Sequence, residues 1–204
     1  MNYQRRYPIG AEVLPQQGAH FRVWAPRRKR VEVVLYRDTE VVSSLQAEND
    51  GYFSGHVSQA RHGDTYRFRL DGDGAFPDPA SRFQPEGPHG PSQLVDPSHY
   101  QWRNTTWRGV KLPGQVMYEL HIGSFTREGT WAAAIDRLPH LHEVGITVIE
   151  VMPVADFPGK FGWGYDGVNM SQTKFVVTVT KPQPASHNRR ASNSSLPKDF
   201  ALST

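Results

Sequence analysis

The stretch Thr65-Tyr-Arg-Phe-Arg-Leu70 carries the clearest structural signal in this sequence. Its residues alternate, with Tyr66, Phe68 and Leu70 on one side and two arginines on the other. Because successive side chains of a β-strand point to opposite faces, this pattern predicts a strand with one buried and one solvated face. The stretch therefore favours an antiparallel sheet that packs one face on a core.

Two earlier stretches follow the same rule. Residues 20–24 place Phe21 and Val23 on one face, and residues 31–35 do so with three apolar side chains. Turn-forming residues separate these runs at 25–26, 49–51 and 61–64. Short strands at this spacing predict a small antiparallel, immunoglobulin-like β-sandwich. In it, Trp24 and Tyr52 either form an exposed platform for a glycan or face the core, and we favour the core.

Residues 71–114 have a different composition. Gly, Pro, Asp and Ser are crowded into residues 71–97, which predicts an extended, irregular connection. The segment also carries four large aromatic residues, which a free linker would not need: Phe76, Phe83, Trp102 and Trp107. We therefore expect this connection to pack on its neighbours.

A third pattern begins at residue 115. The near-continuous apolar runs at 116–122 and 146–152 are typical of parallel strands buried on both faces. Between them, Thr130 is a candidate N-cap, and the residues from Trp131 to Leu138 have helical spacing. Pro139 should kink or restart this helix. Strand, helix and strand together predict one βαβ unit.

The end of the predicted helix has its own signals. Leu141 and Val144 continue its apolar face, and Gly145 is suited to a position just past the last turn. A loop rich in glycine and aromatic residues follows the second strand, at residues 156–169.

Composition and charge exclude several classes of protein. The chain has 204 residues and no cysteine, so disulfide frameworks and thiolate metal sites are excluded. No apolar run reaches the roughly 20 residues of a membrane span, and no secretory signal is recognisable, so a cytoplasmic protein without a membrane partner is expected.

The basic character of the chain does not indicate a nucleic-acid partner. Residues 171–204 hold five Lys and Arg against one acidic residue, whereas residues 1–170 are nearly neutral. The run Arg27-Arg-Lys-Arg30 is interpreted as a solvated turn, with a phosphate contact as the alternative. Residues 171–204 also lack glycine, and we expect a strand within 174–180 and disorder elsewhere.

Eight motifs together carry a family resemblance. They are FRVWAP (21–26), PDPASR (77–82), GPS (90–92), VDP (95–97), YELHIGSFT (118–126), GTW (129–131), EVMPVADF (150–157) and GWGYDG (162–167). In combination they resemble the malto-oligosyltrehalose trehalohydrolases of the α-amylase superfamily. That family releases trehalose from maltooligosyl trehalose, which makes an α-glucan or maltooligosyl trehalose the expected substrate.

The resemblance also implies a mixed fold with three parts. Residues 8–97 are expected to form the N-terminal β-sandwich, and residues 98–170 the start of a (β/α)₈ catalytic barrel. Residues 171–204 do not resemble the family, and we interpret them as an aberrant, frameshifted tail. Retaining glycosidases need two carboxylates about 5 Å apart. The family's carboxylates follow later barrel strands, so we assign no catalytic residue and expect the chain to be inactive alone.

The expected substrate contacts lie in one loop. Tyr165 matches the family tyrosine that stacks under the sugar, with ordinary packing as the alternative. Asp166 could make a polar contact near it or cap a turn, and Trp163 could line the substrate or belong to the core. The alternative function is a non-catalytic, α-glucan-binding or structural sandwich.

Other polar residues are interpreted as structural. Glu119 and Glu150 fall inside the predicted buried strands, where Arg127 or His121 could pair with them. Asp156 lies past the second strand. The histidines lack metal-ligand spacing, so neither a metal nor another cofactor is expected.

Overall fold

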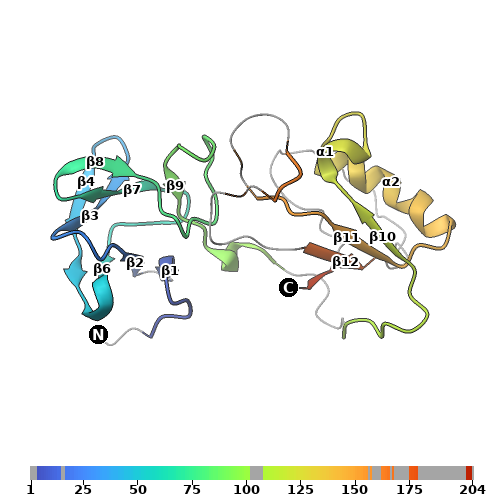
Figure 1. The fold of residues 1–204 in the computed structure, drawn as a ribbon, viewed down its shortest axis with the longest axis horizontal. Helices are drawn as coiled ribbons and strands as arrows, with labels where there is room; N and C mark the ends of the chain where they lie inside the picture. Colours follow the sequence, from blue (N-terminus) through green and yellow to red (C-terminus); the bar gives the residue numbers. More distant parts are fainter. Residues whose placement is uncertain are drawn as a thin grey trace. The chain divides into compact units, whose positions relative to one another are not determined.

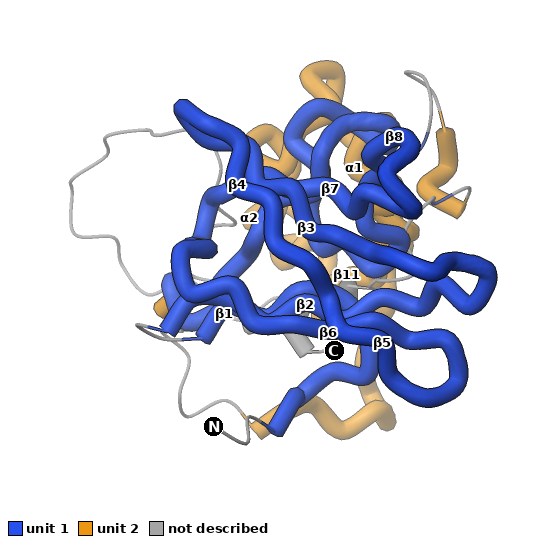
Figure 2. Tube along the Cα trace, turned by 90° about the vertical axis from the view of Figure 1, so that its left-hand side faces the viewer, with its two compact units in different colours: residues 1–99, 156–160, 166–171 blue, residues 100–155, 161–165, 172–204 orange. Residues whose placement is uncertain are grey.

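The protein divides into two compact units in a computed structural model. The structure describes residues 4–14, 17–101, 108–155, 157, 162–165 and 167, together with the backbone of 175–178 and 201–203. Unit 1 comprises residues 1–99, 156–160 and 166–171, and unit 2 comprises residues 100–155, 161–165 and 172–204. Figure 2 distinguishes the two units by colour.

Unit 1 consists of two antiparallel sheets that enclose one core (Figure 1). The first sheet has the order β1-β2-β6-β5, and the second has the order β4-β3-β7-β8, with β9 also pairing with β7. The strands are β1 (Gly10–Leu14), β2 (Gly18–Trp24), β3 (Val31–Tyr36), β4 (Val41–Ser44), β5 (Gln46–Ala47), β6 (Tyr52–Val57), β7 (Thr65–Leu70), β8 (Asp73–Phe76) and β9 (Ser92–Gln93). The short 3₁₀ turns η1 (Asn49–Gly51) and η2 (Pro97–His99) complete the unit.

The predicted alternation of the strands is confirmed by their burial. Phe21 and Val23 of β2 are buried, as are Tyr66 and Phe68 of β7. These strands belong to opposite sheets, so their inward faces meet and form the core. A sandwich with one hydrophobic interior follows, as the sequence predicts.

The connection after β7 is more regular than the sequence predicts. Residues 73–76 form strand β8, which pairs with β7 through a register shift between Arg69 and Leu70, and residues 92–93 form β9. Phe76 and Phe83 are exposed by 51% and 46%, so the expected packing is wrong for these two side chains. Trp102 and Trp107 lie outside the described residues.

Unit 2 contains the predicted strand–helix–strand arrangement. Strands β10 (Met117–Leu120) and β11 (Val148–Val151) are parallel neighbours, joined by helices α1 (Ile122–Phe125) and α2 (Trp131–Glu143). Leu120, Ile149 and Val151 form one apolar cluster with residues of α2. The cluster explains why α2 lies on the sheet, because its buried stripe needs an apolar partner.

The two strands differ in burial. Val148, Ile149 and Val151 of β11 are buried, as predicted. The prediction that residues 116–122 form a strand buried on both faces is wrong: Met117 and Tyr118 are exposed by 49% and 39%. The physical reason is position, because β10 is the edge strand of the sheet order β10-β11-β12-β13 and has a described neighbour on one side only.

Helix α2 begins and ends as its sequence signals predict. Thr130 is the N-cap, and its hydroxyl accepts a hydrogen bond from the backbone N–H of Ala133 at 3.3 Å. Gly145, with φ of +91°, follows the C-cap residue. The N–H of Gly145 bonds to the carbonyl of His142, and the N–H of Ile146 to that of Leu141, which is the Schellman arrangement.

Two details of α2 depart from expectation. The helix runs through Pro139 without restarting. Leu138 and Leu141 on either side of the proline are buried, and their burial offsets the lost backbone hydrogen bond. Val144 is 61% exposed and does not extend the apolar face, because the chain reverses direction at Gly145.

A strand does lie within residues 174–180. Strand β12 (Phe175–Thr178) pairs antiparallel with β11 and with β13 (Ala201–Ser203), so the latter is a strand that the sequence did not predict. The remaining part of the expected disordered tail lies outside the described residues.

Candidate functional site

The first candidate site lies where the parallel strands β10 and β11 end. His121 follows β10 directly and begins α1, while the chain after β11 returns to place Trp163 near it. The ring centroids of His121 and Trp163 are 6.1 Å apart, and the planes are inclined by 47°. In parallel α/β folds the carboxyl ends of strands are where ligand sites are usually built, which makes this edge the first place to look.

Two predicted substrate residues are exposed at this edge. Trp163 is 68% exposed and Tyr165 is 60% exposed. Neither side chain is therefore packed into a core in this structure. Asp166, the third predicted contact, lies outside the described residues. Exposed aromatic rings present flat apolar faces to the solvent, and the C–H groups of a pyranose ring can pack on such faces.

Gly164 fixes the loop that carries both aromatic residues. Its φ is +79°, and a Cβ atom built on it would lie 1.6 Å from the carbonyl oxygen of Pro153. Glycine is therefore required on two grounds, conformation and close backbone approach. Gly164 thus lies against Pro153 in the chain that leaves β11, and this contact constrains the loop between Trp163 and Tyr165.

Replacing Gly164 by alanine should release this loop. The overlap with the Pro153 carbonyl forces the backbone to move, so we expect amide hydrogen exchange in residues 162–165 to accelerate by about tenfold or more. Gly145→Ala is a matched control, because Gly145 also has a positive φ but no atom lies within 4 Å of a Cβ at that position. Equal exchange rates in wild type and Gly164→Ala would contradict the role of this contact.

The predicted structural carboxylates lie beside each other. Glu119 of β10 and Glu150 of β11 are register partners. Glu119 is exposed and Glu150 is half-buried, so the prediction that both are buried is wrong for Glu119. Within the described residues, neither makes an ion pair with Arg127 or His121. Asp156 lies outside the described residues.

His121 has a local structural partner. Its Nδ1 lies 3.1 Å from the hydroxyl oxygen of Ser124, one turn along α1. Across the described part of the chain, no group of three or more His, Asp or Glu side chains is arranged to hold a metal ion. Likewise, no helix among the described residues is both long and apolar enough to cross a membrane.

The second candidate region is the outer face of the first sheet in unit 1. Trp24 is 56% exposed, so the preferred interpretation of Trp24 as a core residue is wrong. The alternation that predicts β2 explains this result, because inward-facing Phe21 and Val23 leave Trp24 on the opposite face. Tyr52 is the register partner of Trp24 on β6 and is half-buried.

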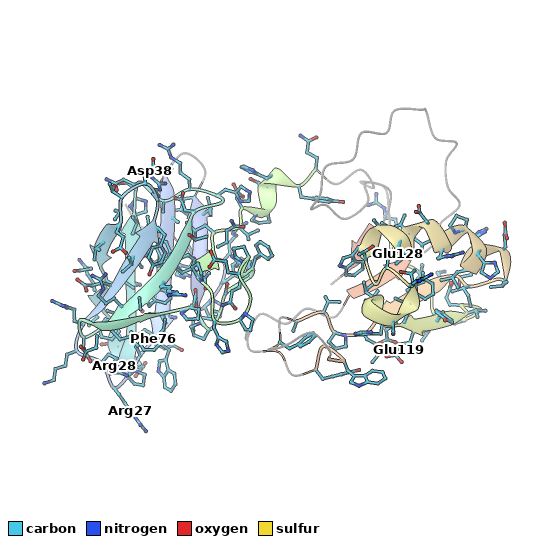
Figure 3. The ribbon with its side chains drawn as sticks, turned by 90° about the horizontal axis from the view of Figure 1, so that it is seen from above. Arg27, Arg28, Asp38, Phe76, Glu119 and Glu128 are labelled. Carbon is cyan, nitrogen blue, oxygen red and sulfur yellow. The ribbon has the colours of Figure 1, made fainter. Side chains whose placement is uncertain are left out.

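The basic run after β2 forms a turn. The carboxylate of Asp71 accepts hydrogen bonds from the backbone N–H groups of Lys29 and Arg30, both at 2.8 Å. The bonds from Arg30 and Lys29 lower the pKa of Asp71. Arg27 and Arg28 project outward from the end of unit 1, where Phe76 also lies in this view (Figure 3). The arrangement agrees with the interpretation as a solvated turn.

Comparison with known proteins gives these features a context. Residues 8–97 match the family model of carbohydrate-binding module 48 (isoamylase N-terminal domain). The chain is 44% identical over 156 residues to malto-oligosyltrehalose trehalohydrolase from Saccharolobus solfataricus, covering 76% of this chain and 27% of that protein. The enzyme of the same name from Deinococcus radiodurans is 42% identical, covering 79% of this chain and 26% of its own length.

The chain is also similar to a solved structure. A putative α-amylase from Salmonella typhimurium is 46% identical with a TM-score of 0.73, and the match covers 79% of this chain and 27% of that one. The chain thus spans about a quarter of the length of the relatives that it matches. Residues 8–97 are therefore similar to carbohydrate-binding module 48 domains, and the chain is similar to the malto-oligosyltrehalose trehalohydrolases and to a putative α-amylase.

Proposed function

We propose that this chain forms the sugar-binding sandwich and part of one substrate wall of an enzyme that releases trehalose from maltooligosyl trehalose. The observation that carries the proposal is the exposed pair Trp163 and Tyr165 at the carboxyl ends of β10 and β11. The chain's similarity to trehalohydrolases supports the choice of substrate. In this proposal, β10, α2 and β11 are the first βαβ unit of a (β/α)₈ barrel.

The role of the wall is to position a sugar rather than to react with it. Tyr165 would stack under a glucose ring, Trp163 would line the same subsite, and Asp166 would make a polar contact. Gly164 would keep the two rings in a fixed relation through its contact with Pro153. A preformed aromatic wall lowers the entropy lost when a flexible oligosaccharide binds.

We further propose that these 204 residues do not hydrolyse the substrate by themselves. A retaining mechanism needs a nucleophile and an acid on opposite sides of the scissile bond. Glu119 and Glu150 are unsuited to this work, because both lie within strands rather than in the loop that carries Tyr165. In this proposal the chemistry requires carboxylates from barrel strands other than β10 and β11.

The proposal can be tested with the purified chain in two measurements. Incubation with maltooligosyl trehalose should release no trehalose, and measurable turnover would refute the lack of activity. In NMR spectra, maltooligosyl trehalose should shift the indole N–H signal of Trp163, and Tyr165→Ala should weaken binding by about tenfold. Val154→Ala is the control, since Val154 is also exposed in the chain after β11. An unshifted Trp163 signal would count against the wall.

A further inference from the structure

Unit 1 contains a cavity of about 390 Å³ that the proposed function does not use. It is lined by residues of β1, the start of β2, the segment that follows β6, and the chain around η2. All of these residues belong to unit 1. Sites for small molecules have volumes of about 300–1,000 Å³, so the cavity is large enough to hold one.

The lining combines buried apolar residues with exposed polar ones. Val13, Leu14 and Ala60 are buried, and they give the cavity an apolar surface. Arg61 and His62 follow Ala60 directly in the chain, line the same cavity and are exposed. A ligand that fits this lining has an apolar body and a polar group.

Arg61 supplies a permanent positive charge at the cavity. Its backbone N–H donates a hydrogen bond to the carboxylate of Asp64 at 2.7 Å, and Asp64 itself forms an ion pair with Arg37. Among the described residues, the guanidinium of Arg61 forms no ion pair. A planar guanidinium with several N–H donors is suited to an oxyanion, which it can contact through two hydrogen bonds at once.

The two histidines of the cavity add further donors. The backbone N–H of Asp96 donates a hydrogen bond to Nδ1 of His62 at 2.9 Å. Because this bond uses the lone pair of Nδ1, the neutral ring carries its hydrogen on Nε2, which is then a donor. The ring of His99 also lines the cavity, and its centroid lies 4.3 Å from that of His62.

Asp96 is the one acidic residue that lines the cavity, and its carboxylate is already engaged. Its side chain is 11% exposed, and the carboxylate lies 3.7 Å from Nε2 of His99 and accepts a hydrogen bond from the N–H of Ser98 at 2.9 Å. Burial acts to raise the pKa of Asp96, but the hydrogen bonds from Ser98 and the charges of His99 and His62 lower it overall. The ionised carboxylate therefore holds His99 beside the cavity and leaves the donors of Arg61 and His62 available.

The loop formed by residues 61–64 is held in place without a ligand. The N–H of Gly63 bonds to the carbonyl of Leu94, and the N–H of Leu94 bonds to the carbonyl of Asp64, both at 2.9 Å. Together with the bond from Asp96 to His62, these contacts fasten the loop to the segment that leads to η2. Donors that are fixed in advance lose less conformational entropy when a ligand binds.

We propose that this cavity binds a small phosphate monoester. The phosphate oxygens accept hydrogen bonds from the guanidinium of Arg61 and from Nε2 of His62, with His99 beside them. The organic part of the ester packs on Val13 and Leu14. A carboxylate is a poorer match, because three terminal phosphate oxygens can meet donors from several side chains at once. Free phosphate is also a poorer match, because it leaves the apolar surface uncovered.

The test is an NMR titration of the full chain with phenyl phosphate, following the ring signals of His62 and His99. We expect both signals to shift with a dissociation constant of about 1 mM, and inorganic phosphate to bind about threefold more weakly or worse. Arg61→Gln should raise the constant for phenyl phosphate by about tenfold or more. Arg27→Gln is the matched control, because it removes the same charge from another exposed arginine of unit 1 and should leave the constant unchanged.

A second variant protects the test against a failure to fold. Arg61→Gln keeps the backbone bond to Asp64, so its melting temperature should equal that of the wild type. Should it be lower, His99→Ala replaces a side chain that is 62% exposed and should raise the dissociation constant about threefold.

Four results would overturn the proposal in whole or in part. Ring signals that do not move at about 10 mM phenyl phosphate, roughly ten times the expected constant, would rule out the site. Equal losses of binding in Arg61→Gln and Arg27→Gln would show a general attraction of anions to unit 1 instead of a site. Equal affinity for benzoate would contradict the choice of a phosphate, and equal affinity for inorganic phosphate would contradict the choice of an ester.

Discussion

Alanine in place of Phe21 should lower the free energy of unfolding of unit 1 by about 3–5 kcal/mol. Phe21 is fully buried between the two sheets, and the edge of one ring meets the face of another in both of its aromatic contacts. Its ring centroid lies 5.1 Å from that of Tyr66 and 6.5 Å from that of Phe68. Removal loses the burial of a large side chain and opens a cavity that rigid strands on both sides cannot close.

Urea denaturation followed by NMR is the appropriate measurement. Trp24 is the one tryptophan within residues 1–99, so its indole signal reports unfolding of this unit separately from unit 2. Phe83→Ala, which removes an exposed ring, should cost less than about 1 kcal/mol. A decrease in the free energy of unfolding below about 1.5 kcal/mol for Phe21→Ala would show that the two sheets can move toward each other and fill the cavity.

The sandwich core was predictable because its signal is local. Alternation along β2 and β7 identifies Phe21, Tyr66 and Phe68 as inward-facing, and no long-range information is needed for that step. The same alternation placed Trp24 on the outer face, but a large aromatic residue has a strong general preference for the interior. We followed this general preference and predicted a core position for Trp24. The alternation along β2 predicts the exposed position that the structure shows.

Unit 2 shows where local signals are insufficient. The apolar run at 116–122 has the composition of a buried strand, yet β10 is an edge strand with exposed Met117 and Tyr118. Burial depends on which segments lie alongside a strand, and a run of apolar residues does not contain that information. The ends of helix α2 were predictable. Thr130 caps its first turn and Gly145 follows its last turn, and both signals depend only on neighbouring residues.

The candidate site was predictable only in part. Tyr165 and Trp163 were identified through a family motif, and no rule of spacing would have selected them. The contact between Gly164 and Pro153 was missed. The two residues are eleven positions apart, and the only sequence feature that indicates such a close backbone approach is the glycine itself. The hydrogen bond from the indole N–H of Trp24 to the carbonyl of Asp50 was missed for a similar reason, since its acceptor is a backbone group.

Asp78→Ala should destabilise unit 1 by about 3 kcal/mol or more. Asp78 is 1% exposed, and its carboxylate accepts a hydrogen bond from the hydroxyl of Tyr66 at 2.6 Å and another from the N–H of Ala80 at 2.8 Å. Alanine removes the acceptor of both bonds, and a buried donor that is left unsatisfied, such as the Tyr66 hydroxyl, costs about 1–3 kcal/mol. Because Tyr66 also contacts Phe21, Asp78→Ala and Phe21→Ala should not be additive.

The double variant Asp78→Ala/Tyr66→Phe distinguishes this mechanism from a simple loss of packing. Removing the hydroxyl as well as its acceptor eliminates one of the unsatisfied donors, so the double variant should be less unstable than the sum of the single variants. Additive losses would mean that the Tyr66–Asp78 bond contributes nothing. Ser81→Ala is a control of similar burial, because its hydroxyl bonds to the carbonyl of Phe83 and not to Asp78.

The pH dependence of stability provides an independent test of the same carboxyl group. Burial raises the pKa of Asp78, although hydrogen bonds from Tyr66 and Ala80 and nearby arginines act in the opposite direction. The folded state therefore keeps a proton that the unfolded chain has already released. Stability from this group is fully present below the unfolded pKa, about 4, and is lost as pH rises through the higher folded pKa. Asparagine at position 78 does not titrate, so the stability of wild type relative to Asp78→Asn should fall as pH rises from 4. A difference that is flat or increases with pH would show that the hydrogen bonds, and not burial, control this carboxyl group.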